Sequence, residues 1–288
     1  MTHRPAPLRQ GDRVTVIAPA GPVHPGLLTA GIAILRTWGL DVHTADHAHD
    51  VHPTLPYLAG HDVDRAADLA KAWHDPDVKA VITARGGYGS QRLLDHLDWH
   101  TLATAPTKHF TGSSDTTALH TEFTRRGIPT LFAPMIGTSA FVHDPQAQEH
   151  LRRALFHPHD THTSPRATTL VGGKAQGTTT GGCLTLLDTP PPPGAIALLE
   201  DIAEDTYALD RLLTRLLRTG WFDTTAAIAL GSWTACGPTA DLVHDRLTPL
   251  GIPLVADLGF GHTGGQLTIP LGVHAELDAD NTTLTILP

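Results

Sequence analysis

Residues 108–120 read KHFTGSSDTTALH, and the change within them from an apolar run to a helical pattern decides the fold of this part of the chain. A sharp turn from strand to helix sets a hydroxyl at a helix N-terminus, where free backbone N–H groups favour an anion. Either Ser113 or Ser114 could carry that hydroxyl, and an N-cap at Asp115 would place Ser114 at the apex. The same residues also suit an ordinary capped helix, and Thr116 departs from the Gly-x-Ser-x-Gly pattern. A nucleophile here therefore needs partners elsewhere in the chain.

Short apolar runs alternate with helical patterns around this turn. Strands are predicted at residues 14–20, 78–84 and 129–133, and helices at 27–38, 62–74 and 91–97. Alternation at this spacing predicts a parallel, doubly wound sheet, so residues 1–150 form an N-terminal domain of the α/β class. Sites in such sheets form at the carboxyl ends of strands, which makes the loops after Ile17, Ala84 and Thr111 candidates.

The character of the sequence changes after residue 150. Residues 151–168 are polar and contain several histidines and prolines, which predicts a linker. Residues 169–288 combine glycine-rich turns and short β-like runs with a leucine-rich helix at 207–217. They therefore predict a C-terminal domain of mixed α/β, β-rich structure.

Composition narrows the classes of partner and compartment. The 288 residues carry a formal net charge of −9 without a Lys/Arg cluster, which argues against nucleic acid and anionic membranes. The N-terminus has no apolar signal segment, and no window approaches the roughly 18 apolar residues of a membrane span. The two cysteines, Cys183 and Cys236, make no disulfide framework. We therefore expect a cytoplasmic protein.

A catalytic serine needs a base and an orienting carboxylate. Among 20 histidines, His262 stands out because glycines flank it in GFGHTGGQ, on a loop between two apolar runs. Glu200 ends the apolar run AIALLE, where a carboxylate at the carboxyl end of a strand is oriented for a site. The alternative for Glu200 is an ordinary acidic helix start, which we assign to Glu204 and Asp205.

The segment Arg85–Gly89, RGGYG, is the second candidate loop. Its glycines permit close approach and positive φ, so the N–H groups of Gly86 and Gly87 could face a developing oxyanion. A phosphate-binding loop is the alternative, but neither glycine-rich phosphate motif matches. Arg85 could clamp a substrate carboxylate or form a structural salt bridge.

Clustered histidines raise the possibility of a metal site. One group comprises His43, His47, His49 and His52, and the other comprises His157, His159 and His162. Neither shows His-Glu-x-x-His spacing or a Cys/His zinc pattern, so we expect no metal and no cofactor. We expect Cys183 to be a small buried residue without a reactive thiol.

Several separated segments together resemble the LD-carboxypeptidase family of serine peptidases. They are GDRVTVIAPAGPV, AVITARGGYGSQRLLDHLDW, FTGSSDTTALH, ALLEDIAEDTYALDRLL and GFGHTGGQLTIPLGVHAELD. The resemblance implies a flavodoxin-like or Rossmann-like N-terminal domain and a mixed β C-terminal domain, with the site between them. It implies a triad of Ser114, Glu200 and His262, with oxyanion donors at the N–H of Asp115 and at Gly86 or Gly87.

The implied reaction is hydrolysis, through an acyl-enzyme, of the amide that joins the L-centre of a diamino acid to terminal D-alanine in a muropeptide. The microcin C immunity branch of the family implies a peptide–nucleotide or other modified-peptide antibiotic instead. Three features differ from the family pattern and put the substrate in question: Ser113 replaces an aromatic residue, Cys183 replaces an asparagine, and the span at 187–200 is short.

Two other functions remain open at this point, a non-catalytic ligand-binding relative and a metal-dependent hydrolase built on the histidines. The resemblance to the LD-carboxypeptidase family also implies that the protein forms a homodimer.

Overall fold

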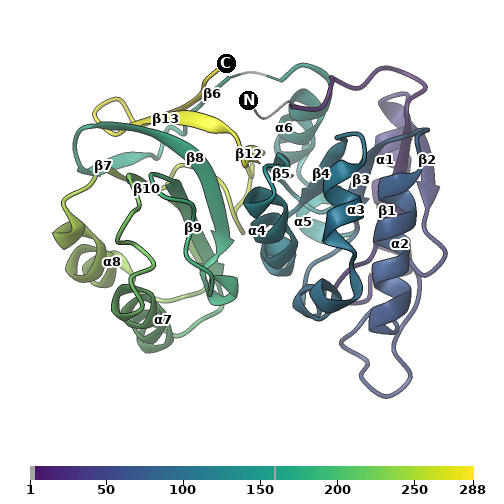
Figure 1. The fold of residues 1–288 in the computed structure, drawn as a ribbon, viewed down its shortest axis with the longest axis horizontal. Helices are drawn as coiled ribbons and strands as arrows, with labels where there is room; N and C mark the ends of the chain where they lie inside the picture. The colour runs from purple at the N-terminus through teal and green to yellow at the C-terminus, as the bar shows by residue number, and fades with distance from the viewer. Residues whose placement is uncertain (1–3, 159) are drawn as a thin grey trace.

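The computed structural model describes residues 4–158 and 160–288. Two sheets lie next to each other, and helices cover the outer face of one and both faces of the other (Figure 1). The chain therefore has the predicted mixed α/β architecture. None of the helices in the described ranges is long and apolar enough to cross a bilayer.

The first sheet has the strand order β12-β5-β4-β3-β1-β2. Its strands are β1 (Arg13–Ile17), β2 (Asp41–Thr44), β3 (Val78–Thr83), β4 (His109–Gly112), β5 (Thr130–Phe132) and β12 (Ile269–Leu271). Strands β1 to β5 are parallel, whereas β12 pairs antiparallel with β5. The parallel order 2-1-3-4-5 is that of flavodoxin-like folds, which confirms the predicted sheet.

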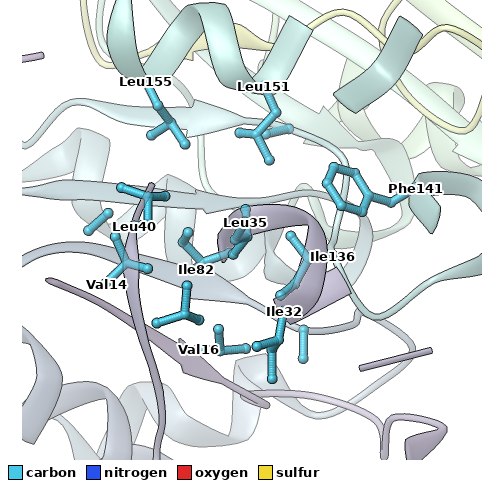
Figure 2. Packing of buried hydrophobic residues seen from close by; sticks show 14 of the residues in the cluster. Val14, Val16, Ile32, Leu35, Leu40, Ile82, Ile136, Phe141, Leu151 and Leu155 are labelled. Carbon is cyan, nitrogen blue, oxygen red and sulfur yellow. The ribbon is translucent and has the colours of Figure 1, made fainter. Parts of the chain in front are cut away.

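Helices pack on both faces of this sheet through apolar side chains. They are α1 (Pro25–Thr37), α2 (Asp62–His74), α3 (Trp99–Thr104), α4 (Thr117–Arg125), α5 (Ser139–Val142) and α6 (Pro145–Phe156). Figure 2 shows one of the two cores, in which α1, α5 and α6 pack against β1 and β3. The other core joins α2, α3 and α4 to the opposite face. The predicted helix at 91–97 is instead the 3₁₀ helix η1 (Ser90–His96).

The second sheet has the order β6-β14-β13-β8-β9-β10-β11-β7. Its strands are β6 (Thr161–His162), β7 (Thr168–Val171), β8 (Lys174–Cys183), β9 (Ile196–Ile202), β10 (Ala227–Thr234), β11 (Leu254–Ala256), β13 (His274–Asp278) and β14 (Thr283–Ile286). Strands β8 to β11 are parallel. The long strand β8 curves because its first half pairs with β13 and its second half with β9 (Figure 1).

Helices α7 (Thr206–Arg218) and α8 (Ala240–Leu247) cover the outer face of the second sheet. The inner face shares a core with the first sheet, because Phe132 of β5 and both apolar ends of β12 belong to the same cluster as the residues of β9 and β10. This shared core fixes one sheet against the other and so sets the geometry of any site between them.

The predicted division at residues 150 and 168 stays a prediction. Helix α6 runs across residue 150, and β6, inside the predicted linker, pairs with β14. Strand β12, from the second half of the chain, completes the edge of the first sheet.

Candidate active site

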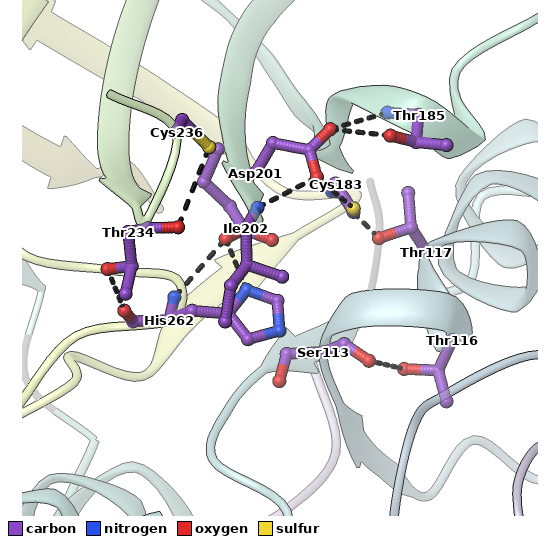
Figure 3. Close-up of polar contacts among 11 residues, drawn as sticks. Ser113, Thr116, Thr117, Cys183, Thr185, Asp201, Ile202, Thr234, Cys236 and His262 are labelled. Carbon is purple, nitrogen blue, oxygen red and sulfur yellow. Dashed lines mark hydrogen bonds and ion pairs between the residues drawn. The ribbon is translucent and has the colours of Figure 1, made fainter. Parts of the chain in front are cut away.

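The turn after β4 holds the candidate nucleophile in an uncommon backbone conformation. Ser114 has φ 57°, in the left-handed region that few residues other than glycine adopt. The hydroxyl of Thr116 donates to the carbonyl oxygen of Ser113 (2.8 Å) and closes the turn (Figure 3). The short 3₁₀ helix η2 (Ser114–Thr116) then leads into α4. Strained non-glycine residues of this kind are concentrated at functional sites.

Asp115 does not cap this helix, so the N-cap prediction is wrong. Its carboxylate accepts from the backbone N–H of Ser90 (2.7 Å), and its carbonyl oxygen accepts from the Ser90 hydroxyl. The Asp115 carboxylate binds the backbone N–H of Ser90 instead of the N–H groups at the start of its own helix. Asp115 thereby ties the serine turn to the end of the glycine-rich loop.

The glycine-rich loop lies directly against Ser114. A Cβ on Gly86 would come within 2.9 Å of the Ser114 Cβ and 3.1 Å of its Oγ. The carbonyl oxygen of Gly86 accepts from the N–H of Gly21 (2.9 Å), and Gly87 has φ 104°. Glycine at position 86 permits the close approach, and glycine at position 87 permits the positive φ. The structure therefore brings together Ser114 and Gly86 as the sequence predicts.

A buried arginine that the sequence did not single out anchors this loop. The Arg65 side chain is fully buried and donates to the carbonyl oxygens of Pro19 and Gly89, the latter at 3.1 Å. It also pairs with Asp62, which binds Arg92 as well. The helical pattern around residue 65 gives no hint of this role, because it depends on loops from two distant strands.

Across the site, Glu200 and His262 form a bonded acid–base pair. Glu200 is fully buried near the end of β9, and its Oε2 lies 2.7 Å from His262 Nδ1 and accepts from the His262 backbone N–H (3.2 Å). Gly261, with φ 90°, makes room, because a Cβ there would lie 2.6 Å from Oε2. The sequence prediction that these two residues are partners agrees with this geometry.

The electrostatics of the pair favour a basic imidazole. Burial alone lowers the pKa of His262, but the hydrogen bond to Glu200 and the charge of that carboxylate outweigh it and raise the pKa above 6.5. The His262 side chain keeps about one fifth of its surface exposed (21%), so it remains accessible. Nδ1 is committed to Glu200, which leaves Nε2 for proton transfer.

The end of β8 connects this pair to the serine turn. Cys183 lies beside Glu200 in the register of β8 and β9, and its backbone N–H donates to the hydroxyl of Thr117 (3.0 Å). Thr117 begins α4, three residues after Ser114. The imidazole of His262 points towards the turn that contains Ser113 and Thr116 (Figure 3).

The loop that carries His262 is also anchored to the first half of the chain. The Asp144 carboxylate, at the start of α6, accepts from the Gly265 N–H (2.6 Å), and His150 Nδ1 lies 3.1 Å from the Gln266 carbonyl oxygen. Both sides of the candidate site are therefore fixed to the same scaffold.

Asp201, next to Glu200, organises a second buried network. Its carboxylate accepts from the N–H and hydroxyl of Thr185 (2.9 and 2.7 Å), from the Ile202 N–H (2.8 Å) and from the Cys183 thiol (3.3 Å). Burial, together with the charges of Glu200 and Asp201, raises the pKa of Cys183. The prediction of a buried, unreactive Cys183 agrees with these contacts, whereas the role of Asp201 was missed.

Arg85 lies beside the site but forms no salt bridge to any described residue, so that alternative is wrong. Its exposed guanidinium donates to the Pro22 carbonyl oxygen (2.6 Å). Its predicted role towards a substrate carboxylate stays a prediction. Within residues 4–158 and 160–288, no group of three or more histidine, cysteine or acidic side chains could hold a metal ion, and His159 lies outside these ranges.

Comparison with known proteins defines the class: this chain is a serine carboxypeptidase, a hydrolase. Residues 14–133 match the LD-carboxypeptidase N-terminal domain, and residues 176–277 match the LD-carboxypeptidase C-terminal domain. The chain therefore belongs to the LD-carboxypeptidase family, as the resemblance predicted.

Relatives match along nearly the full length of the chain. A Streptomyces coelicolor protein, named provisionally as a carboxypeptidase, is 50% identical over 98% of this chain and 96% of its own. The murein tetrapeptide carboxypeptidase of Pseudomonas aeruginosa is 32% identical over 93% of this chain and 94% of its own. The microcin C7 self-immunity protein of Escherichia coli is 26% identical over 98% of this chain and 94% of its own.

Among solved structures, the muramoyltetrapeptide carboxypeptidase from Oxalobacter formigenes is similar in fold. Its TM-score is 0.81 at 29% identity, over 96% of this chain and 99% of that chain.

Proposed function

We propose that this chain hydrolyses the amide between the L-centre of diaminopimelate and the terminal D-alanine of muropeptides, with Ser114, Glu200 and His262 as its triad. The observation that carries the proposal is the 2.7 Å contact between His262 Nδ1 and a fully buried Glu200 oxygen, with the imidazole directed towards the serine turn (Figure 3). The names of the murein relatives support the substrate class.

Each residue has a defined role in the proposed reaction. His262 Nε2 takes the proton of Ser114 as Oγ attacks the carbonyl carbon, while Glu200 stabilises the resulting imidazolium. The N–H of Asp115 and that of Gly86 or Gly87 donate to the oxyanion. His262 then gives its proton to the departing amine of D-alanine, which leaves an ester on Ser114. Water, activated by His262, hydrolyses that ester.

A second candidate substrate is a peptide–nucleotide or other modified-peptide antibiotic. It is favoured by the likeness to the microcin C7 self-immunity protein along 98% of the chain, and by Ser113 and Cys183 at positions that differ from the family pattern. The proposed triad would serve either substrate, because the chemistry at the amide is the same.

The deciding experiment measures D-alanine release from the tetrapeptide L-Ala-γ-D-Glu-diaminopimelate-D-Ala. The wild type is compared with Ser114→Ala, with Ser113→Ala as the matched control, and with chelator added. Release that requires Ser114 and survives Ser113→Ala and chelator supports the proposal. No release, with Ser114 still labelled by a serine-directed probe, would favour the antibiotic substrate. Neither release nor labelling would point to a non-catalytic binding protein.

The cytoplasmic location and the homodimer also stay predictions. Light scattering of the purified protein measures its oligomeric state directly.

A further inference from the structure

A cavity of 360 Å³ lies beside the loop that carries His262 and has no role in the mechanism above. It opens at the carboxyl ends of β10 and β11, the edge of a parallel sheet at which ligands usually bind. Two of its lining residues adjoin the proposed base: Thr263 follows His262, and the hydroxyl of Thr234 donates to the His262 carbonyl oxygen. The cavity therefore borders the backbone of the loop that carries the proposed base.

Two exposed residues of opposite charge line the cavity, and neither forms an ion pair with another described residue. Arg166 lines it, and within the described residues its guanidinium makes one hydrogen bond, from Nη2 to the Thr263 hydroxyl (3.1 Å). Asp257 lines it too and forms no hydrogen bond or ion pair through its carboxylate within the described part of the chain. The two charged side chains line the same cavity and do not pair with each other, so both can bind a ligand that carries charges of both signs.

Two further features indicate a built site. Asp257 has φ 54°, in the left-handed region, which Asp adopts more readily than most non-glycine residues. The Ser232 hydroxyl, also in the lining, is buried and has no hydrogen-bond partner among the described residues. An unsatisfied buried hydroxyl is uncommon and can be satisfied by a polar ligand.

We propose that this cavity binds the zwitterionic end of the diamino-acid side chain, with Arg166 on its carboxylate and Asp257 on its ammonium group. The inference rests on the proposed function, because it identifies which muropeptides that site prefers. Diaminopimelate carries both a carboxylate and an ammonium group at the far end of its side chain, whereas lysine carries only the ammonium group. A guanidinium binds a carboxylate through two parallel hydrogen bonds, which a lysine side chain cannot accept.

The test measures binding rather than turnover, so that it does not depend on hydrolysis. Calorimetry with the Ser114→Ala variant gives the Kd for three tetrapeptides that differ at the third residue: diaminopimelate, its side-chain amide, and lysine. We expect the diaminopimelate peptide to bind about tenfold more tightly than the other two, the size of one charge-assisted pair. Adding Arg166→Met should abolish the preference for the peptide with the free carboxylate. Adding Asp257→Asn should weaken the binding of the diaminopimelate and lysine peptides by the same factor.

Matched controls separate recognition from damage to the His262 loop. Arg218→Met and Asp95→Asn remove exposed charges that form no hydrogen bond or ion pair with a described residue, and both should leave every Kd unchanged. If Arg166→Met weakened the binding of all three peptides equally, Arg166 would have a structural role and the inference would be overturned. Equal binding of all three peptides before that change would overturn it as well.

The same measurements distinguish the two proposals. If the wild type releases D-alanine equally from diaminopimelate and lysine peptides, the proposed function stands and the inference fails. If the wild type releases none, but Ser114→Ala binds the diaminopimelate peptide through Arg166, the proposed function fails and the inference stands.

Discussion

In the first sheet the candidate site is made largely of backbone: Ser114 occupies a left-handed turn, and Gly86 packs against it because it has no side chain. In the second sheet the candidate site is made of ionisable side chains, with Glu200 fully buried and His262 bonded to it. The first half thus depends on conformation and the second on charge. The comparison shows that the two halves should respond to different changes, one to added volume and the other to altered pH.

The largest effect should come from removing the proposed nucleophile. Ser114→Ala should lower kcat by at least about 10⁴-fold, because losing a triad member leaves only binding and the oxyanion donors. The free energy of unfolding should hardly change, since alanine keeps the backbone and removes one oxygen. Steady-state D-alanine release and chemical denaturation measure the two quantities. A comparable loss in Ser113→Ala would place the nucleophile one residue earlier.

On the second sheet, Glu200→Gln should lower kcat by about 10³–10⁴-fold, since the amide no longer holds the right tautomer or stabilises the imidazolium. The acid limb of kcat/KM should also move. The base acts when neutral, so the raised pKa of His262 puts the wild-type limb above pH 6.5. Without the carboxylate, burial dominates, and the limb should fall below pH 6.5. If the acid limb of the Glu200→Gln variant did not move, the pairing of Glu200 with His262 would be contradicted. Glu276→Gln, on β13, serves as the control.

On the first sheet, Gly86→Ala should lower kcat by about 10²-fold or more without moving the pH profile. The new Cβ would lie 2.9 Å from the Ser114 Cβ, so either the serine or the oxyanion loop must shift. Gly264→Ala is the matched control, because a Cβ there meets nothing closer than 4.0 Å. Full activity in Gly86→Ala would show that the loop does not position the site.

The sequence predicted the backbone half of the site better than the buried networks around it. Glycines and the Gly-Ser-Ser-Asp turn are local signals, and the helix predicted at 62–74 matches α2 residue for residue. Strand β8, KAQGTTTGGC, has no alternating apolar pattern, since its pairing is set by β9 and β13 far along the chain. Arg65 and Asp201 were missed for the same reason: their roles depend on burial and on partners that only the fold brings together.

A second buried histidine, His120, differs from His262 in the direction of its pKa shift. His120 on α4 is fully buried, with Nε2 2.9 Å from the Gly112 carbonyl oxygen and Nδ1 2.7 Å from the Thr130 hydroxyl. No carboxylate among the described residues compensates for its burial, so desolvation lowers the pKa of His120 to about 4. Two imidazoles on opposite sides of the site are therefore shifted in opposite directions.

The lowered pKa of His120 should make the fold acid-sensitive. Below pH 6.5 the unfolded chain binds a proton that the folded chain refuses, so stability falls as the pH drops from 6.5 to about 4 and no further below that value. The total loss from this group is about 3 kcal/mol, because each pKa unit corresponds to about 1.4 kcal/mol. Denaturation midpoints at a series of pH values should show this loss in the wild type and a smaller one in His120→Gln. An identical pH dependence in both would mean that His120 accepts a proton in the folded state as readily as in the unfolded chain.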